Sequence, residues 1–476
     1  MPDPRSPKAS DSLPGPRGLP IVGHLHRIRL NRLHLILEDW AEQYGKIFQF
    51  RIGPHRIVVI SDRSEIQNIL FQRPGTYRRT SALESVAKEM NLNGVFSSEG
   101  DGWRQQRKLV VSAFDRQNLR SFFPKLAVIV ARLQKRWERA ADASEEVDIC
   151  RDLMRFTVDV TMQFAFGVDA NTLETSGPVI QRHLDQVFPV VHTRMYAVFP
   201  WWRHIKLPSD RAFMKSLAVI EDEIRNLINL TRERMKAEPG RFDDPENFLE
   251  AIITASKVED SGISDTEIFA NVGNLLLAGE DTTANSLAWI IYFLLKYPHH
   301  FKRAQQEVDA VLSPEPILVR MEQTTNLPFV DACCSETMRL KPVAPLHVVQ
   351  TMSDVNILGC AIPTGTQVML LTRKIAMQDE NFGHGKLFDP DRWLTSTQDT
   401  GFSHDRRAFV PFGNGPRICP GRVLALLEIR SVLAMLCRNF VIEPVRSLDD
   451  VVERLAFTMM PVNLPVMIRR RPQAME

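Results

Sequence analysis

Apolar residues recur every three or four positions along most of the chain, which predicts a mainly helical protein. The pattern is nearly continuous from 101 to 340. Prolines predict breaks at 122–124, 188–208, 239–240 and 298. The longest uninterrupted part, 265–296, predicts a helix that crosses the whole molecule. Its most apolar stretch, 287–295, is too short to span a membrane, so we expect it to be buried.

Alternation of apolar and polar residues is limited to short stretches, which predicts small sheets beside the helices. Residues 47–52 and 56–60 flank Gly53-Pro54 and predict a β-hairpin. Alternation returns between 346 and 371, and short extended segments follow a last predicted helix over 421–438. The sequence therefore predicts a mainly α fold with a long central helix and small peripheral β-sheets.

Two stretches of the chain carry neither pattern. Residues 1–20 are rich in proline and predict an extended lead-in, and residues 373–410 are polar and irregular. A structureless stretch as long as the second usually has a function inside a compact domain. Because no stretch has the composition of an inter-domain linker, we expect residues 1–476 to form one domain.

Charge and cysteine content exclude several classes of protein. The 59 basic and 57 acidic residues leave a net charge of +2, which does not favour a nucleic-acid partner. No apolar run near the N-terminus suits a signal peptide or a membrane span, so we expect a cytoplasmic protein without a transmembrane segment. The six cysteines include no CxxC pair and fit free thiols in a reducing compartment. The adjacent Cys333 and Cys334 predict two helical positions rather than a disulfide.

The segment 412–421, FGNGPRICPG, places Cys419 in a loop that leads into an apolar helix. Its glycines allow backbone to approach a flat group closely, and Arg417 is positioned to pair with an anion. A helix N-terminus favours a thiolate, and N–H groups aimed at the sulfur tune a bound iron. A lone cysteine in a turn is more often structural. Here several neighbours are specified together, which predicts a thiolate ligand to a haem iron.

The predicted long helix carries the hexapeptide AGEDTT at 278–283. Gly279, Thr282 and Thr283 share one helix face. A glycine there costs roughly 1 kcal/mol, and with Thr282 it would open a notch for a small ligand such as dioxygen. The Thr282 hydroxyl and the Asp281 carboxylate would pass protons to that ligand. The alternative is a kinked helix with a back-bonded threonine, and the hexapeptide alone does not separate the two.

Two further motifs place arginines near partners. Trp103 and Arg107 lie one helical turn apart and present donors that suit a pair of carboxylates. Glu336 and Arg339 form an i,i+3 pair, and Arg392 lies beside an aromatic residue. Taken alone, each is more often a solvated helix face or a surface ion pair.

These motifs follow one another in the same order as in the cytochrome P450 superfamily of haem-thiolate monooxygenases, which the chain resembles. The resemblance runs from the lead-in PGPRGLPIVG to the final strands. It implies the large, mainly α fold of that family, with haem b as cofactor. It also implies that Cys419 is the axial iron ligand, with Phe412 packed beside the sulfur and Gly413 and Gly421 in the loop around it.

The same resemblance gives roles to the other motifs. Thr282, with Asp281, would protonate dioxygen so that the O–O bond breaks. The haem propionates would be bound by Trp103, Arg107 and Arg417. A buried triad would hold the irregular segment before the cysteine loop, and its members would be Glu336, Arg339 and Arg392.

The sequence departs from the family pattern in two places. His347 is shifted from the usual position of a propionate-binding residue, so its contact with a propionate is an open hypothesis. Asp391 and Trp393 stand where glutamate and phenylalanine are usual.

We expect a monomeric monooxygenase of the soluble bacterial type, which hydroxylates or epoxidises a hydrophobic substrate. No flavin or iron–sulfur pattern occurs in the sequence, so electrons would come from a separate ferredoxin- or flavodoxin-type donor. That donor would dock near Arg104, Lys108, Arg422 and Arg430. One alternative is a peroxide-driven or isomerising haem-thiolate enzyme, whose relatives typically lack the acid–threonine pair. The other is a non-catalytic haem sensor, which would carry an output domain.

The resemblance places the substrate pocket among segments that are mostly apolar, which favours a hydrophobic substrate. These segments are 83–96, 187–202, the long helix, 343–349 and 457–460. The aromatic stretches 188–191 and 199–202 would form a mobile lid or touch a membrane surface, and core packing explains any single side chain among them equally well.

Overall fold

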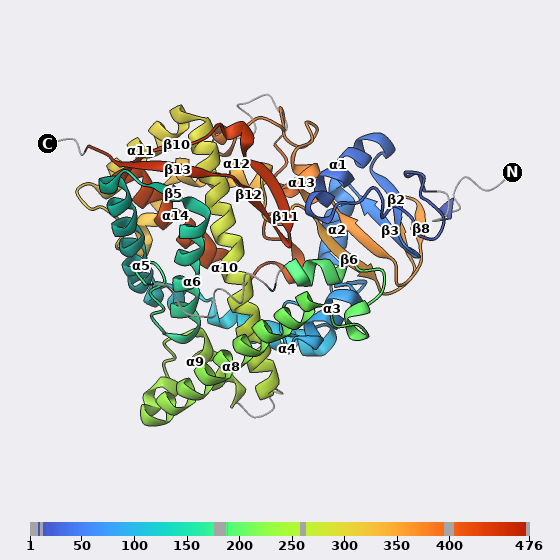
Figure 1. Cartoon of the computed structure of the whole chain (residues 1–476), viewed down its shortest axis with the longest axis horizontal. Coiled ribbons are helices and arrows are strands. Elements are labelled where there is room, and N and C mark those ends of the chain that lie inside the picture. Colours follow the sequence, from blue (N-terminus) through green and yellow to red (C-terminus); the bar gives the residue numbers. More distant parts are fainter. Residues whose placement is uncertain are drawn as a thin grey trace.

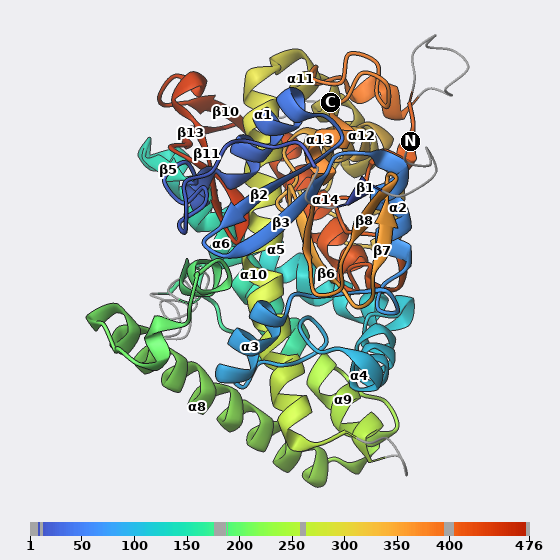
Figure 2. The same cartoon turned by 90° about the vertical axis from the view of Figure 1, so that its right-hand side faces the viewer.

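The predicted long helix is α10 (Asp265–Lys296), which runs through the centre of the molecule (Figures 1 and 2). The computed structural model describes residues 8–9, 13–175, 187, 189–257, 263–394 and 404–472. Ser264 accepts the N–H of Glu267, whose carboxylate accepts the N–H of Ser264 in return. This capping box starts the helix at the residue that the sequence predicts.

Other helices pack around α10 and form most of the body. They are α1 (Leu33–Tyr44), α2 (Arg63–Phe71), α3 (Ser81–Glu89), α4 (Gly100–Ala113), α5 (Arg116–Ala143), α6 (Ile149–Phe166), α8 (Pro208–Ala237), α9 (Phe248–Ser256), α11 (Pro298–Leu312), α12 (Pro328–Leu340), α13 (Thr372–Ala376) and α14 (Arg422–Asn439). The mainly helical fold with a long central helix is thus as predicted.

In the described part of the chain the strands form four small sheets, and the largest has the order β2-β3-β9-β6-β4. Their bounds are β1 (Lys8–Ala9), β2 (Ile47–Ile52), β3 (His55–Ile60), β4 (Tyr77–Arg78), β5 (Glu146–Asp148), β6 (His347–Thr351), β7 (Val355–Ile357), β8 (Cys360–Ile362), β9 (Gln367–Leu370), β10 (Phe440–Pro444), β11 (Val452–Ala456), β12 (Thr458–Val462) and β13 (Pro465–Arg470). The predicted hairpin at 47–60 is confirmed as β2–β3, and the alternation at 346–371 becomes β6 to β9.

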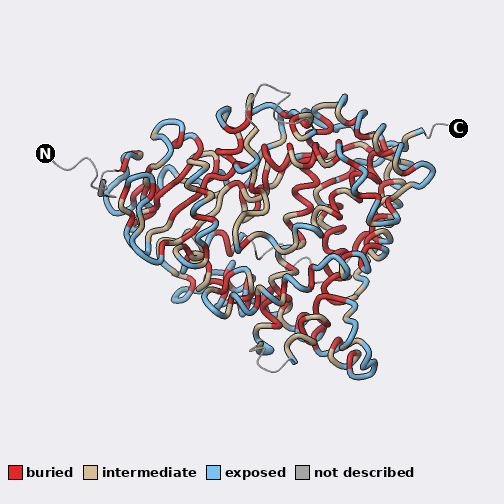
Figure 3. The backbone as a smooth tube through the Cα atoms, turned by 180° about the vertical axis from the view of Figure 1, so that it is seen from behind, coloured by how far each residue is buried: buried red, intermediate tan, exposed pale blue. Residues whose placement is uncertain are grey.

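Figure 3 shows buried residues throughout the interior of the molecule. Among the described residues, the buried hydrophobic side chains form two cores. The larger lies among the helices, and every residue of α10 from Leu287 to Leu295 is buried in it, as predicted. The smaller lies where β3 and β9 pack against α2, for example through Val58, Ile66 and Val368. Within the described ranges, no helix combines the length and apolar content that crossing a membrane requires.

The helix break predicted at 122–124 is wrong, because α5 runs through Pro124. A proline inside a helix removes one backbone hydrogen bond and costs about 3 kcal/mol. The buried face of α5 continues on both sides of it, through Phe123, Leu126 and Trp137. Each such side chain contributes roughly 1.5–3 kcal/mol when buried, so packing outweighs the cost.

The other predicted breaks fall near element ends. α11 begins at Pro298, and a 3₁₀ turn, Pro239–Phe242, follows α8. Within the predicted break at 188–208, residues 189–195 are helical, while Phe188 lies outside the described residues. That residues 1–476 form one domain, with 1–20 as its lead-in, stays a prediction.

Candidate active site

The cysteine loop, residues 412–421, is closed on itself and leads into α14. The N–H of Cys419 donates to the Phe412 carbonyl at 2.9 Å. The N–H groups of Gly421 and Arg422, at the start of α14, are directed at the Cys419 sulfur. A Cβ on Gly421 would lie 4.0 Å from that sulfur. The loop therefore presents the sulfur to two N–H donors at a helix N-terminus, as its sequence predicts.

The Cys419 thiol is accessible, although protein surrounds it on most sides. Burial raises the pKa of this thiol above its usual value, and the Gly421 N–H and the Arg107 guanidinium lower it in part. A thiol in this setting gives up its proton when it binds a metal, because the metal replaces the proton as the bound cation.

Trp103 and Arg107, both on α4, contact the cysteine loop from one side. The Arg107 guanidinium donates to the Ile418 carbonyl at 2.6 Å. The Arg417 guanidinium lies 4.4 Å from the centre of the Trp103 ring. The structure thus brings three residues, predicted from two separate motifs, into one site.

Arg417 belongs to a group of buried arginines that the sequence did not reveal. We call Arg73, Arg79 and Arg417 the arginine cluster. Within the described ranges, Arg73 Nε and Nη2, Arg79 Nε, and Arg417 Nε and Nη1 are buried without a hydrogen-bond partner. Glu99 is their neighbouring carboxylate: it pairs with Arg417 at 2.7 Å and accepts the backbone N–H of Arg79 at 2.7 Å.

The arginine cluster holds like charges in a buried position, so its charged form is unfavourable unless further anions bind to it. Burial, followed by the charge of Arg417, lowers the pKa of Arg73 to about 10, and burial lowers that of Arg79 well below its usual value. Unpaired buried cations are costly, so the cluster fits a ligand that carries carboxylates. The sequence signal that could have revealed this cluster is the presence of three arginines between positions 73 and 79, although arginines so close together usually lie on a surface.

His347 lies at the start of β6, next to the cysteine loop and the arginine cluster. A Cβ on Gly413, which has a φ of +73°, would lie 3.7 Å from His347 Nε2. Burial, with the charges of Arg73 and Arg79, lowers the pKa of His347 to about 3. The imidazole is therefore neutral, and its shifted sequence position still brings it into the site.

The predicted triad is present and fully buried. Glu336 pairs with Arg339 at 2.7 Å and with Arg392 at 3.0 Å. The Trp393 indole N–H also donates to Glu336, at 2.9 Å. Arg339 donates to the carbonyls of Ala376 and Leu387 in the irregular segment, at 2.8 and 2.9 Å.

The two residues of this segment that depart from the family pattern, Asp391 and Trp393, both have partners in the structure. Trp393, in place of the usual phenylalanine, adds a fourth side chain to the triad. Asp391 forms an ion pair with Arg303 at 2.6 Å. Phenylalanine has no donor, so the indole hydrogen bond is a feature of this chain.

On α10, Asp281 is buried and held by polar neighbours. One carboxylate oxygen accepts the Asn285 amide at 2.9 Å, and the other accepts the hydroxyl of Thr458 on β12. The Thr282 hydroxyl donates to the Ala278 carbonyl at 2.8 Å, so the back-bonded threonine is the observed arrangement. The Thr282 side chain is only half-buried.

Gly279 does not open the notch that its position suggested. A Cβ there would lie 2.6 Å from the hydroxyl oxygen of Thr161 on α6, so this side of the helix is filled by the neighbouring helix. The glycine is required because α6 and α10 approach closely. Of the two alternatives that the hexapeptide left open, the notch is not formed on this side of the helix.

A family model described as Cytochrome P450 matches residues 13–467. The chain belongs to the cytochrome P450 family. It is 29% identical to cytochrome P450 27C1 of Danio rerio, over 92% of this chain and 82% of that protein. It is 26% identical to cytochrome P450 2K4 of Oncorhynchus mykiss, over 94% and 90%. The haem domain of cytochrome P450DA has the same fold, with a TM-score of 0.84 at 23% identity over 97% of this chain and 98% of that one.

Membership confirms the predicted family, fold, cofactor and reaction class. The chain is a haem-thiolate monooxygenase that uses protohaem IX. The residues present fit that cofactor, because the arginine cluster offers buried donors to two carboxylates beside a cysteine loop. The bacterial type stays a prediction.

Proposed function

We propose that Cys419 is the thiolate ligand of the haem iron and that the arginine cluster, with Trp103 and Arg107, binds the propionates. The observation that carries this is the set of buried guanidinium donors beside a sulfur that accepts two backbone N–H groups. Bound haem supplies the activation of dioxygen. Because Arg417 precedes Cys419 by two residues, one loop carries both the ligand and a propionate anchor.

We propose that Thr282 and Asp281 supply protons to dioxygen. Thr282 Oγ1 would turn from the Ala278 carbonyl toward the substrate side, and the Asp281 carboxyl would replace the donated proton. Thr458 and Asn285 hold that carboxyl in place. The same pair supports a monooxygenase over a peroxide-driven or isomerising enzyme, which needs no such relay. A haem sensor would need neither group.

Replacing Thr282 with alanine tests this role. We expect the variant to consume reductant while a smaller fraction of it appears as product. The matched control is Ser256→Ala, because Ser256 also donates its hydroxyl to a helix carbonyl, that of Ile253 on α9, at 2.7 Å. Unchanged coupling in Thr282→Ala would rule out the proton role.

We propose a hydrophobic substrate, which the chain hydroxylates or epoxidises. Support comes from the apolar side chains of the predicted pocket segments. Among them, the ring centres of Phe96 and Phe457 lie 6.0 Å apart. We further propose that the protein acts as a monomer in the cytoplasm. Its six free cysteines fit a reducing compartment.

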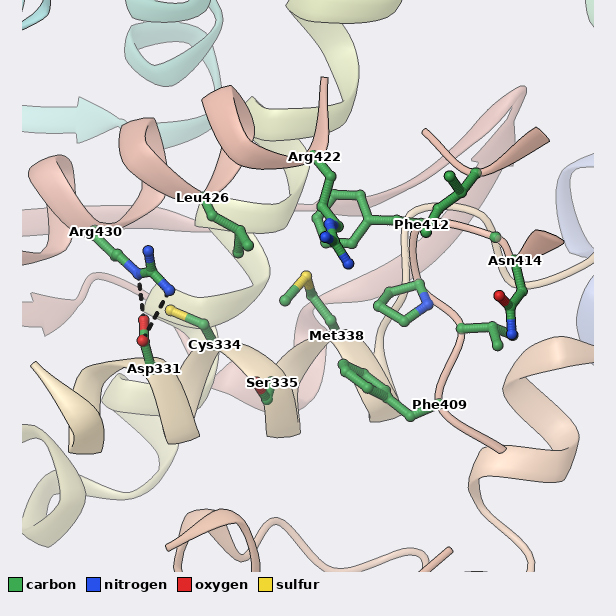
Figure 4. Close-up of a pocket in the computed structure, with 14 residues that line it drawn as sticks. Asp331, Cys334, Ser335, Met338, Phe409, Phe412, Asn414, Arg422, Leu426 and Arg430 are labelled. Carbon is green, nitrogen blue, oxygen red and sulfur yellow. Dashed lines mark hydrogen bonds and ion pairs between the residues drawn. The ribbon is translucent and has the colours of Figure 1, made fainter. Parts of the chain in front are cut away.

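We propose that a ferredoxin- or flavodoxin-type donor docks beside the cysteine loop. A depression of about 310 Å³ lies there. Figure 4 shows the residues that line it, Phe412 and Arg422 among them. Arg430 is tied to Asp331 at 2.5 Å and Arg104 to Asp101. Within the described ranges, Lys108 and Arg422 have no ion pair, so they are the cations most available to an acidic partner.

Turnover with a ferredoxin measured against salt tests the docking proposal. We expect the rate to fall as salt rises, and to fall less steeply in Lys108→Glu and Arg422→Glu. Lys215→Glu, at an exposed position on α8, is the control. A rate that does not respond to salt would contradict the electrostatic contribution.

A further inference from the structure

A second depression, of about 850 Å³, opens between the first two turns of α6 and the hairpin β11–β12. We call it the α6 pocket. Its other lining residues come from β5, from α10 and from the segments that lead out of β10 and into β13. It shares no lining residue with the depression beside the cysteine loop. Its volume lies in the range that is usual for sites of small organic ligands.

Four arginines from three parts of the chain line this pocket. They are Arg151 and Arg155 on α6, Arg446 after β10 and Arg454 on β11. None of them forms an ion pair with a carboxylate that the structure describes. Asp152, the acid next to Arg151 in the sequence, is already paired with Arg136 at 2.7 Å. The four guanidinium groups therefore suit an anion from outside the chain.

The charges that line the α6 pocket do not balance. Beside the four arginines stand two carboxylates, Glu146 and Asp148, which leaves an excess of two positive charges. The Asp148 carboxylate accepts the N–H of Arg151 at 3.1 Å and so caps α6. Burial, followed by the charges of Arg136 and Arg151, lowers the pKa of Arg155. A bound anion would offset this repulsion.

The inner wall of the pocket is mostly apolar. Leu464 is buried, and Met154 and Met460 are half-buried, whereas three of the four arginines are exposed. The Cys150 thiol also lines the wall and is neutral, because burial raises its pKa to about 12. The amide of Asn285 is already engaged, since it donates to Asp281 at 2.9 Å. The wall thus suits an apolar body, and the mouth suits an acid group.

We propose that the α6 pocket binds an amphipathic organic anion, such as an aromatic or short-chain acid, and that this ligand is not the substrate. Its acid group would pair with the arginines, because a guanidinium holds a carboxylate or sulfonate by two N–H groups. Its apolar body would lie against Met154, Met460 and Leu464, where methionine side chains adapt to its shape. A small polar anion leaves that wall uncovered and binds more weakly. The site goes beyond the proposed function.

Titration with 1-naphthalenesulfonate tests the site. The haem-loaded protein is first saturated with imidazole, which binds the iron, and binding is then measured by isothermal titration calorimetry. We expect one site whose affinity falls about tenfold in Arg446→Gln and in Arg454→Gln, because each change removes one charge-assisted hydrogen bond. Arg211→Gln, at an exposed position on α8 outside the pocket, is the matched control and should bind as the parent does.

Two analogues separate the acid group from the apolar body. Methanesulfonate keeps the acid group and lacks the rings, and 1-naphthalenemethanol keeps the rings and lacks the charge. Both should bind at least about tenfold more weakly than 1-naphthalenesulfonate, and the alcohol should not respond to Arg454→Gln. Equal affinity for methanesulfonate would show an adventitious ion only and would overturn the proposal. Equal affinity for the alcohol would overturn it as well.

The absorption spectrum of the haem shows where the anion binds. A ligand in the α6 pocket leaves imidazole on the iron, so the spectrum should not change. Displacement of imidazole would place the anion over the iron and overturn the separate site. Unchanged affinity in both arginine variants, or no binding at millimolar concentrations, would also overturn it. None of these measurements needs turnover, so a protein that forms no product would contradict the proposed function and leave this test intact.

Discussion

The cysteine loop and the loop of residues 91–98, which leads from α3 to α4, are held by different kinds of interaction. The segment before the cysteine loop is fixed by Glu336 and Arg339, both 0% exposed, with Arg392 and Trp393. Residues 91–98 are held by two neutral amides on α10, those of Asn271 and Asn274, which accept the N–H groups of Val95 and Phe96. Removing one member of a buried charge pair costs about 3–5 kcal/mol, whereas a neutral hydrogen bond contributes about 1 kcal/mol.

This difference matters for the proposed haem site. A proposed iron ligand must stay fixed, and the buried charges around the segment before the cysteine loop do not separate at thermal energies. Neutral hydrogen bonds exchange more readily. We therefore expect the cysteine side to be rigid and the side of residues 91–98 to open more easily. Four changes test that difference, and the largest effect is expected first.

Cys419→Ser removes the proposed ligand from the rigid side. We expect monooxygenase activity to fall by more than about 100-fold, and the red-shifted carbon monoxide absorption band to disappear. Cys150→Ser, at a half-buried thiol outside the loop, should keep both. Persistence of the band in Cys419→Ser would show that another group binds the iron.

Glu336→Gln breaks the charges that hold the rigid side. Two arginines would lose their carboxylate in a fully buried site, so we expect unfolding free energy to fall by about 3–5 kcal/mol. Trp393→Phe removes only the indole donor and should cost about 1 kcal/mol. Urea unfolding measures both. An equal loss of unfolding free energy in the two variants would contradict the expectation that the buried charges stabilise this segment more than the neutral hydrogen bond does.

Arg73→Met tests the arginine cluster where the two sides meet. Removing a buried cation that lacks a partner should stabilise the haem-free protein by about 1–3 kcal/mol. The same change should weaken haem retention, measured by transfer of haem to apomyoglobin. A structural arginine would show the opposite sign in the first measurement. Lower stability of the haem-free variant would therefore reject the proposed role.

Acid should weaken the fold through His347. Its pKa is about 3 in the folded protein, because of burial and of Arg73 and Arg79, and is near 6.5 when unfolded. Between these values the unfolded chain binds the extra proton, so stability rises with pH by up to about 1.4 kcal/mol per unit. His347→Gln should reduce that slope in urea unfolding of the haem-free protein. His26→Gln, at an exposed position, should leave it unchanged.

The sequence predicts best what depends on neighbours in the chain. Glu336 with Arg339, Arg417 with Cys419, and the start of α10 are all encoded within a few residues. The contacts of Trp393 and of the α10 asparagines were missed because their partners are remote: Phe96 and Asn274 are 178 positions apart. Pro124 was misjudged because local preference lost to packing. Arg73 and Arg79 were missed because burial, which gives them meaning, follows from the fold.

The charge balance of the arginine cluster has a consequence for the life of the protein in a cell. Three buried guanidinium groups share one neighbouring carboxylate, Glu99. If the two haem carboxylates bind this cluster, as proposed, they make up the difference, and the free energy of haem binding is also folding free energy. The amount of intact protein should therefore follow the supply of haem. When haem synthesis lags behind translation, more of the chain is open to proteases.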